Sequence, residues 1–165
     1  DLQIDLDGVK AVITKKTKAV IAAHMFGRSC NVERLVKLCR DKKIILIEDV
    51  CQAESSQYKD RMLGSFGDIA VFSFSYYKPM SSCGGGGGMV VGNDVKVDRI
   101  RAWMEDWKND DDLLKLGQRF APLYFMDMIA LRVKFSRIKE IIASRDKAKA
   151  LYEKGLGSLK AVTIF

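Results

Sequence analysis

The sequence has few of the residues that build metal centres and disulfide frameworks. It contains one histidine and four cysteines in 165 residues, and no two cysteines have the C-x-x-C spacing. A zinc site is therefore not expected, and we predict no bound metal. Unpaired, scattered thiols suit a reducing compartment, which predicts a cytoplasmic protein.

Long apolar runs are also absent. A helix needs about 18 or more consecutive apolar residues to cross a bilayer, and the nearest stretch, 123–133, is interrupted by Asp127. No signal peptide is recognisable. The sequence therefore predicts no membrane partner. Its first residue is Asp1 rather than Met, which leads us to expect an excised or processed piece.

Acidic residues are scarce near the end of the chain, where most of the net charge of +7 is concentrated. Between Arg132 and Lys160 there are nine Lys or Arg and three Asp or Glu. Such a stretch could bind phosphate or nucleic acid, but a solvated helix face is the more common explanation of exposed charge. Because it has neither interleaved aromatic residues nor a known motif, we predict no nucleic-acid partner.

Apolar strands alternate with amphipathic helices in the first part of the chain. We expect a helix within 2–14, with Asp5 and Asp7 as candidate caps, and a helix at 32–42, after the cap Asn31. Strands are expected at 18–23, ending at His24, and at 44–47, where four apolar residues suggest burial on both faces. This alternation predicts an α/β fold with parallel strands.

The pattern changes farther along the chain. A hairpin-like turn is expected at 58–61, and strands are expected at 69–72 and 89–91. From residue 95 the sequence favours helices, at 95–107, at 112–116 and at 123–151, the last broken near Ser144. An α/β part is therefore followed by a helical part.

Three polar residues, whose side chains could act together on one ligand, follow two of these strands. Asp49 comes after the strand at 44–47, and Ser73 and then Lys78 follow the strand at 69–72. Ligands of open α/β sheets bind at this carboxyl edge. A carboxylate can keep a pyridine nitrogen protonated, an amine can form a Schiff base, and a hydroxyl can hold a phosphate. Gln52 could contact the ring. Together these residues predict half of a pyridoxal phosphate site.

Each residue taken alone has a simpler explanation. An aspartate at the end of a strand is more often a turn residue, and a single lysine such as Lys78 is more often exposed to solvent. The simpler role of His24 is that of a hydrogen-bonded polar residue at a strand end, and the simpler role of the glycines at 84–88 is a flexible loop. The spacing of the whole set is what favours a cofactor site.

That spacing resembles the DegT/StrS family of pyridoxal phosphate-dependent aminotransferases of sugar nucleotides, which serve polysaccharide biosynthesis. The matching stretches are EDVCQA at 48–53, GSFGDIAVFSF at 64–74, Lys78 and the glycines at 86–88. The resemblance implies fold type I, the aspartate aminotransferase-like architecture. It further implies a partial large domain with a mostly parallel sheet at 1–106 and the helical start of the small domain at 107–165.

The resemblance also assigns roles. Asp49 would pair with the pyridine nitrogen, Gln52 would contact the ring, and Ser73 would bind the phosphate. Lys78 would form the internal aldimine and move the proton, and a lysine rather than the histidine of related dehydratases favours transamination. Arg119 would reach the phosphate from the partner subunit of a homodimer. The amino group would pass from an amino acid, expected to be glutamate, to a keto-sugar nucleotide.

Some positions depart from the family pattern. Glu54 stands where the family usually has histidine, Tyr77 replaces a small residue and Pro79 replaces an asparagine. These changes leave the sugar undetermined and keep open a non-catalytic regulatory or binding paralogue. Family members are much longer than this chain, so we expect the isolated fragment to bind cofactor poorly and to be inactive.

Overall fold

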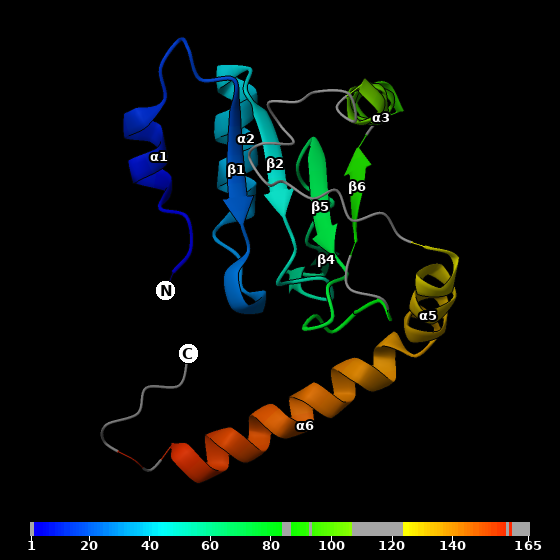
Figure 1. Cartoon of the computed structure of the whole chain (residues 1–165). Coiled ribbons are helices and arrows are strands. Elements are labelled where there is room, and N and C mark those ends of the chain that lie inside the picture. Colours follow the sequence, from blue (N-terminus) through cyan, green and yellow to red (C-terminus); the bar gives the residue numbers. More distant parts are fainter. Residues whose placement is uncertain (1, 84–86, 93, 107–123, 158, 160–165) are drawn as a thin grey trace, which may run out of the picture.

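The computed structural model describes residues 2–83, 87–92, 94–106, 124–157 and 159. Its centre is a four-stranded sheet in the order β1-β2-β5-β6 (Figure 1). Strands β1 (Ala19–Ala23), β2 (Ile45–Asp49) and β5 (Ile69–Ser73) are parallel, and β6 (Gly88–Gly92) pairs antiparallel with β5. The predicted strands and the mostly parallel sheet are confirmed.

The two predicted N-terminal helices are present, and both have side-chain caps. Helix α1 (Leu6–Val12) begins after Asp5, whose carboxylate accepts hydrogen bonds from the backbone N–H groups of Asp7 and Gly8. Helix α2 (Val32–Lys42) begins after Asn31, whose side chain accepts one from the N–H of Arg34. Helix α3 (Asp94–Asp106) follows β6, as predicted from residue 95 onward.

Helix α2 packs on one face of the sheet, and this decides how each strand is buried. A core cluster joins Leu35 and Cys39 of α2 to Val20, Ala22 and Leu46 of the strands. The opposite face is more open, since Ile21 is 63% exposed and Ile45 is 39% exposed. The prediction that the β2 stretch is buried on both faces is therefore wrong, because only alternate residues of this strand face α2.

A short antiparallel hairpin follows β2. It pairs β3 (Gln57–Tyr58) with β4 (Arg61–Met62), and the turn between them contains Lys59 at φ 52°. The hairpin predicted at 58–61 is confirmed. A short 3-10 helix, η1 (Met25–Gly27), follows β1 at the same edge of the sheet.

Two helices near the end of the described chain support the segment after β5. Leu131 of α5 (Phe125–Ser136) packs against Phe74 and Met80, and Lys134 donates hydrogen bonds to the backbone oxygen and hydroxyl of Ser81. The next helix, α6 (Ile138–Leu156), is separated from α5 at Arg137, so the break predicted near Ser144 is misplaced.

Arg137 lies between the two helices for a local reason. Its backbone, at φ −109° and ψ 14°, leaves the helical region, while its side chain pairs with Glu140 in the first turn of α6. The helix predicted at 112–116 lies outside the described residues. Among the described residues, no helix has both the length and the apolar character needed to cross a bilayer.

Candidate functional site

The ends of β2 and β5 bring two of the predicted site residues to one edge and one face of the sheet. The two strands are parallel neighbours, so both end at the same edge, as their arrowheads show in Figure 1. Asp49 is paired in register with Val71, and Ser73 lies two residues farther along β5. Because side chains alternate along a strand, Asp49, Val71 and Ser73 point to the same face, which is the face opposite α2.

Asp49 is half-buried at the last position of β2. Its Oδ1 accepts a hydrogen bond of 3.0 Å from the backbone N–H of Cys51, and its backbone carbonyl accepts one of 3.0 Å from the N–H of His24. The carboxylate is therefore fixed in direction by the turn that follows the strand, with its side chain on the more open face.

Gln52 and Ser73 lie on either side of this position. The carboxamide oxygen of Gln52 accepts a 3.2 Å hydrogen bond from the N–H of Phe26, so Gln52 holds the loop after β1. Phe26 has a left-handed backbone, with φ 55°, and is 68% exposed. Ser73 donates to the hydroxyl of Ser75 at 3.4 Å. Both predicted residues are at this edge of the sheet.

Lys78 lies in the turn after β5, where its backbone N–H donates to the carbonyl of Ser75 at 2.9 Å. Both Lys78 and Asp49 act electrostatically on Cys51. Burial, together with the hydrogen bond and negative charge of Asp49, raises the pKa of the Cys51 thiol to about 12, and the positive charge of Lys78 opposes that rise. Cys51 therefore lies within electrostatic reach of both predicted catalytic groups.

Two further predictions concern residues around this edge. Arg119 lies outside the described residues, as do the glycines at 84–86. Gly88 begins β6, and a Cβ atom there would lie 2.7 Å from the backbone oxygen of Phe72. A side chain at Gly88 would push β6 away from β5, so part of the glycine run has a packing role.

Glu48 is the residue of the site region that the sequence did not single out. Its side chain is 0% exposed, and its Oε2 accepts hydrogen bonds from His24 Nε2 at 3.1 Å and from the N–H of Gly64 at 2.9 Å. Its Oε1 accepts from the N–H groups of Phe66 at 2.7 Å and Gly67 at 2.6 Å. The carboxylate ties β1, β2 and the segment before β5 together.

The environment of Glu48 favours its charged form. Burial alone would raise the pKa of Glu48, but the hydrogen bonds from His24 and from the three backbone N–H groups outweigh it, so the pKa lies below its ordinary value. Strand alternation was the signal that could have separated the two acidic residues: Glu48 shares the buried face with Leu46, and Asp49 does not.

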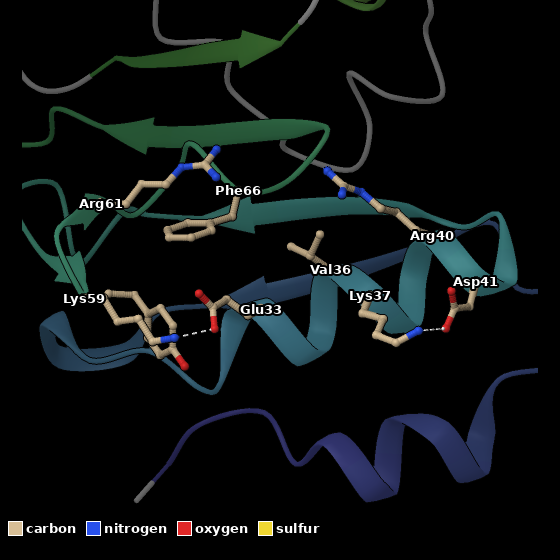
Figure 2. Close-up of a pocket in the computed structure, with 9 residues that line it drawn as sticks. Glu33, Val36, Lys37, Arg40, Asp41, Lys59, Arg61 and Phe66 are labelled. Atoms are coloured by element: carbon tan, nitrogen blue, oxygen red, sulfur yellow. Dashed lines mark hydrogen bonds and ion pairs between the residues drawn. The ribbon is translucent and has the colours of Figure 1, made fainter.

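A surface pocket elsewhere does not contain the predicted site. It has a volume of about 400 Å³ and lies between α2 and the β3–β4 hairpin (Figure 2). Its charges are mostly paired within the protein, through Lys37 with Asp41 at 2.9 Å and Lys59 with Glu33 at 2.6 Å. None of Asp49, Gln52, Ser73 and Lys78 lines it.

Comparison with known proteins agrees with this arrangement of strands. The chain is 41% identical over 167 residues to the GDP-perosamine synthase of Vibrio cholerae, a match that covers 96% of this chain and 43% of that protein. The crystal structure of DesI, determined in the presence of its TDP-sugar product, superposes with a TM-score of 0.77 at 27% identity, over 99% of this chain and 41% of that one.

A third relative shows the fold alone. The E. coli GDP-4-keto-6-deoxy-D-mannose-3-dehydratase with bound hydrated PLP superposes with a TM-score of 0.72 at 20% identity, over 96% of this chain and 45% of that one. The chain therefore spans less than half the length of these relatives. It has the predicted fold type I architecture, as a partial chain with a mostly parallel sheet.

The family profile covers the entire chain. Residues 1–165 match the profile described as the DegT/DnrJ/EryC1/StrS aminotransferase family. The chain belongs to the DegT/DnrJ/EryC1/StrS aminotransferase family.

Proposed function

We propose that the protein containing this chain transfers an amino group from an amino acid to a keto-sugar nucleotide, with pyridoxal phosphate as cofactor. We expect the amino acid to be glutamate. The observation that supports the proposal is the strand register, which brings Asp49 and Ser73 to one edge of the sheet, with Lys78 in the turn that follows β5. Membership of the family and the similarity to GDP-perosamine synthase support the reaction class.

The described residues fit pyridoxal phosphate. Asp49 offers a fixed carboxylate on the open face, suited to a protonated pyridine nitrogen. Ser73 offers a hydroxyl, which accepts a 3.5 Å hydrogen bond from the backbone N–H of Ser75 and could donate its own proton to a phosphate oxygen. When bound, the cofactor supplies an electron sink for the carbon that carries the amino group. Gln52 would orient the ring from the loop side, and Arg119 would add a phosphate contact from the partner subunit of a homodimer.

Lys78 has two tasks in this proposal. Its Nζ would hold the cofactor until the amino donor takes that place. The freed Nζ would then act as the base that accepts a proton from the donor carbon and as the acid that gives it up again, which is general acid–base work by one residue. The turn at Ser75 and the packing of Phe74 and Met80 against α5 hold the lysine near the ends of β2 and β5.

A direct experiment measures transamination with the protein in its full natural length. With glutamate and GDP-4-keto-6-deoxy-D-mannose, mass spectrometry should detect an amino sugar nucleotide from the wild type. Lys78→Ala should reduce its formation by at least about 100-fold, because general acid–base catalysis contributes that much or more. Lys59→Ala, in the hairpin, is the matched control and should keep wild-type turnover. Equal turnover of Lys78→Ala and the wild type would refute the proposal.

A second candidate function is a regulatory or binding protein of the same fold. The departures from the family pattern at Glu54 and Tyr77 favour it. It predicts that the full-length protein binds cofactor or nucleotide sugar but gives no amino sugar from any keto-sugar nucleotide supplied. Testing GDP-, UDP- and TDP-linked keto sugars in one panel separates the two functions.

A further inference from the structure

The surface pocket between α2 and the β3–β4 hairpin lies apart from the candidate cofactor site. Its volume of about 400 Å³ is within the range of natural ligand pockets. Helix α2, which forms one wall of the pocket, covers one face of the sheet, whereas Asp49 and Ser73 point to the opposite face. A ligand in this pocket would therefore use none of the residues assigned to the cofactor.

The centre of the pocket is apolar. Val36 comes from α2, Tyr58 from the hairpin and Phe66 from the segment before β5, and all three side chains are half-buried. The two aromatic rings meet edge to face, with 6.0 Å between their centroids. An apolar group placed against these side chains would remove their remaining surface from water, which favours binding.

Arg61 is held in a fixed orientation beside this apolar centre. Its guanidinium lies over the Phe66 ring, 4.3 Å from the ring centroid, and its Nε donates a 2.9 Å hydrogen bond to the Ser65 hydroxyl. Its Nη2 donates to the Ser65 carbonyl. Both acceptors are neutral, so the guanidinium keeps its full charge and its remaining N–H donors for a ligand. Because the side chain is already ordered, binding an anion would cost little of its conformational freedom.

Arg40 supplies a second guanidinium from α2. Its side chain is exposed and forms no hydrogen bond or ion pair with any residue that the structure describes. Asp68 is within electrostatic reach of Arg40, but the Asp68 carboxylate pairs with Lys96 at 2.8 Å and accepts a 2.9 Å hydrogen bond from the N–H of Leu46. Arg40 is therefore available to an external anion.

The unpaired positive charge of the pocket lies on these two arginines. The two lysines that line the pocket are paired with its two carboxylates, so no lining carboxylate is left for Arg40 or Arg61. Figure 2 shows the two guanidinium groups toward opposite ends of the pocket, with Phe66 and Val36 between them. A complementary ligand carries an anionic group at each end and an apolar group in the middle.

We propose that this pocket binds an acidic peptide segment of a partner protein, in which an aliphatic side chain lies between acidic residues. Carboxylates of the peptide would pair with Arg61 and Arg40, and the aliphatic side chain would pack on Val36 and Phe66. A nucleotide matches the pocket less well, because its phosphates gather at one end and the Phe66 ring already has a guanidinium over it. The proposal is independent of the aminotransferase reaction.

The test is fluorescence anisotropy with the full-length protein and the rhodamine-labelled peptide Glu-Glu-Leu-Glu-Glu. Binding should be saturable and should weaken between about 50 and about 300 mM salt, since exposed charge pairs are screened. Arg61→Ala and Arg40→Ala should each raise the dissociation constant about fivefold or more, because arginines often dominate the affinity of such interfaces. Peptides with Gln in place of Glu, or with Gly in place of Leu, should bind more weakly by a similar factor.

Helix α2 offers a matched control. Arg34 is also an exposed arginine of α2 but does not line the pocket, so Arg34→Ala should change the dissociation constant by less than about twofold. Arg40→Ala removes an exposed side chain without a partner among the described residues, so its fold should be intact. The test therefore does not depend on Arg61, whose loss would also free the Ser65 acceptors.

Saturable binding that both pocket variants weaken and Arg34→Ala does not supports the peptide site. No saturable binding to the wild type, or equal binding by the wild type and Arg40→Ala, overturns it. GDP is the probe for the other class of ligand: binding of GDP but not of the peptide, weakened by Arg40→Ala, would also overturn the proposal. Because the assay contains neither cofactor nor keto sugar, a failure of transamination would leave its result intact.

Discussion

At the scale of single residues, two adjacent carboxylates have different roles because successive side chains of a strand point to opposite faces of the sheet. Glu48 points to the covered face of β2, where four hydrogen bonds enclose it. Asp49 points to the other face, at the edge where β5 also ends. Two adjacent acidic residues thus supply one carboxylate that stabilises the fold and one that is placed where a ligand could bind.

Replacing Glu48 tests whether its carboxylate stabilises the fold. Glu48→Gln should lower the free energy of unfolding at pH 7 by about 2–3 kcal/mol, because it leaves buried donors without a charged acceptor. Urea denaturation measures the change. Glu33→Gln, at an exposed position, is the control and should change the value by less than about 0.5 kcal/mol.

The pH dependence of stability has a definite sign. Since the pKa of Glu48 in the folded state lies below its ordinary value of 4.5, its contribution is fully present above that pH and is lost as the pH falls through the folded-state value. Wild-type stability should therefore decline below about pH 4.5, and Glu48→Gln should decline less steeply there. Parallel pH curves for the two proteins would contradict this account.

At the scale of elements, the sequence anticipated those features that depend on local chemistry. The caps Asp5 and Asn31, the hairpin turn at Lys59 and the apolar strands all have short-range signals. The error on β2 came from a contact between distant segments, because burial of this strand depends on which face α2 covers. The misplaced helix break has a local origin at Arg137, whose backbone leaves the helical region and whose side chain pairs with Glu140.

The cap of α2 gives a prediction at this scale. Asn31→Ala removes the acceptor for the N–H of Arg34 and should lower the free energy of unfolding by about 1 kcal/mol. Asp41→Ala, which removes an exposed pair with Lys37 near the other end of α2, should cost only about 0.3–0.5 kcal/mol. Thermal or urea unfolding of both variants measures the difference, and equal losses would contradict the capping role.

At the scale of the whole molecule, we propose that the candidate site is one side of a larger enclosure. The chain spans 43% of the GDP-perosamine synthase that it resembles. It contains the strand ends that present Asp49 and Ser73, and the turn that presents Lys78. The motif spacing predicted these three residues together, because each follows a strand. It could not predict that α5 and α6 pack against the segment that carries Lys78, since that packing joins segments far apart in the sequence.

We propose that Lys78 holds the cofactor beside Asp49. The most direct measurement is reduction of the full-length protein with sodium borohydride in the presence of pyridoxal phosphate, which makes the link between cofactor and lysine permanent, followed by peptide mapping. We predict the added mass on the peptide that contains Lys78 and its loss in Lys78→Ala. Addition at another lysine such as Lys59, with none at Lys78, would contradict the account.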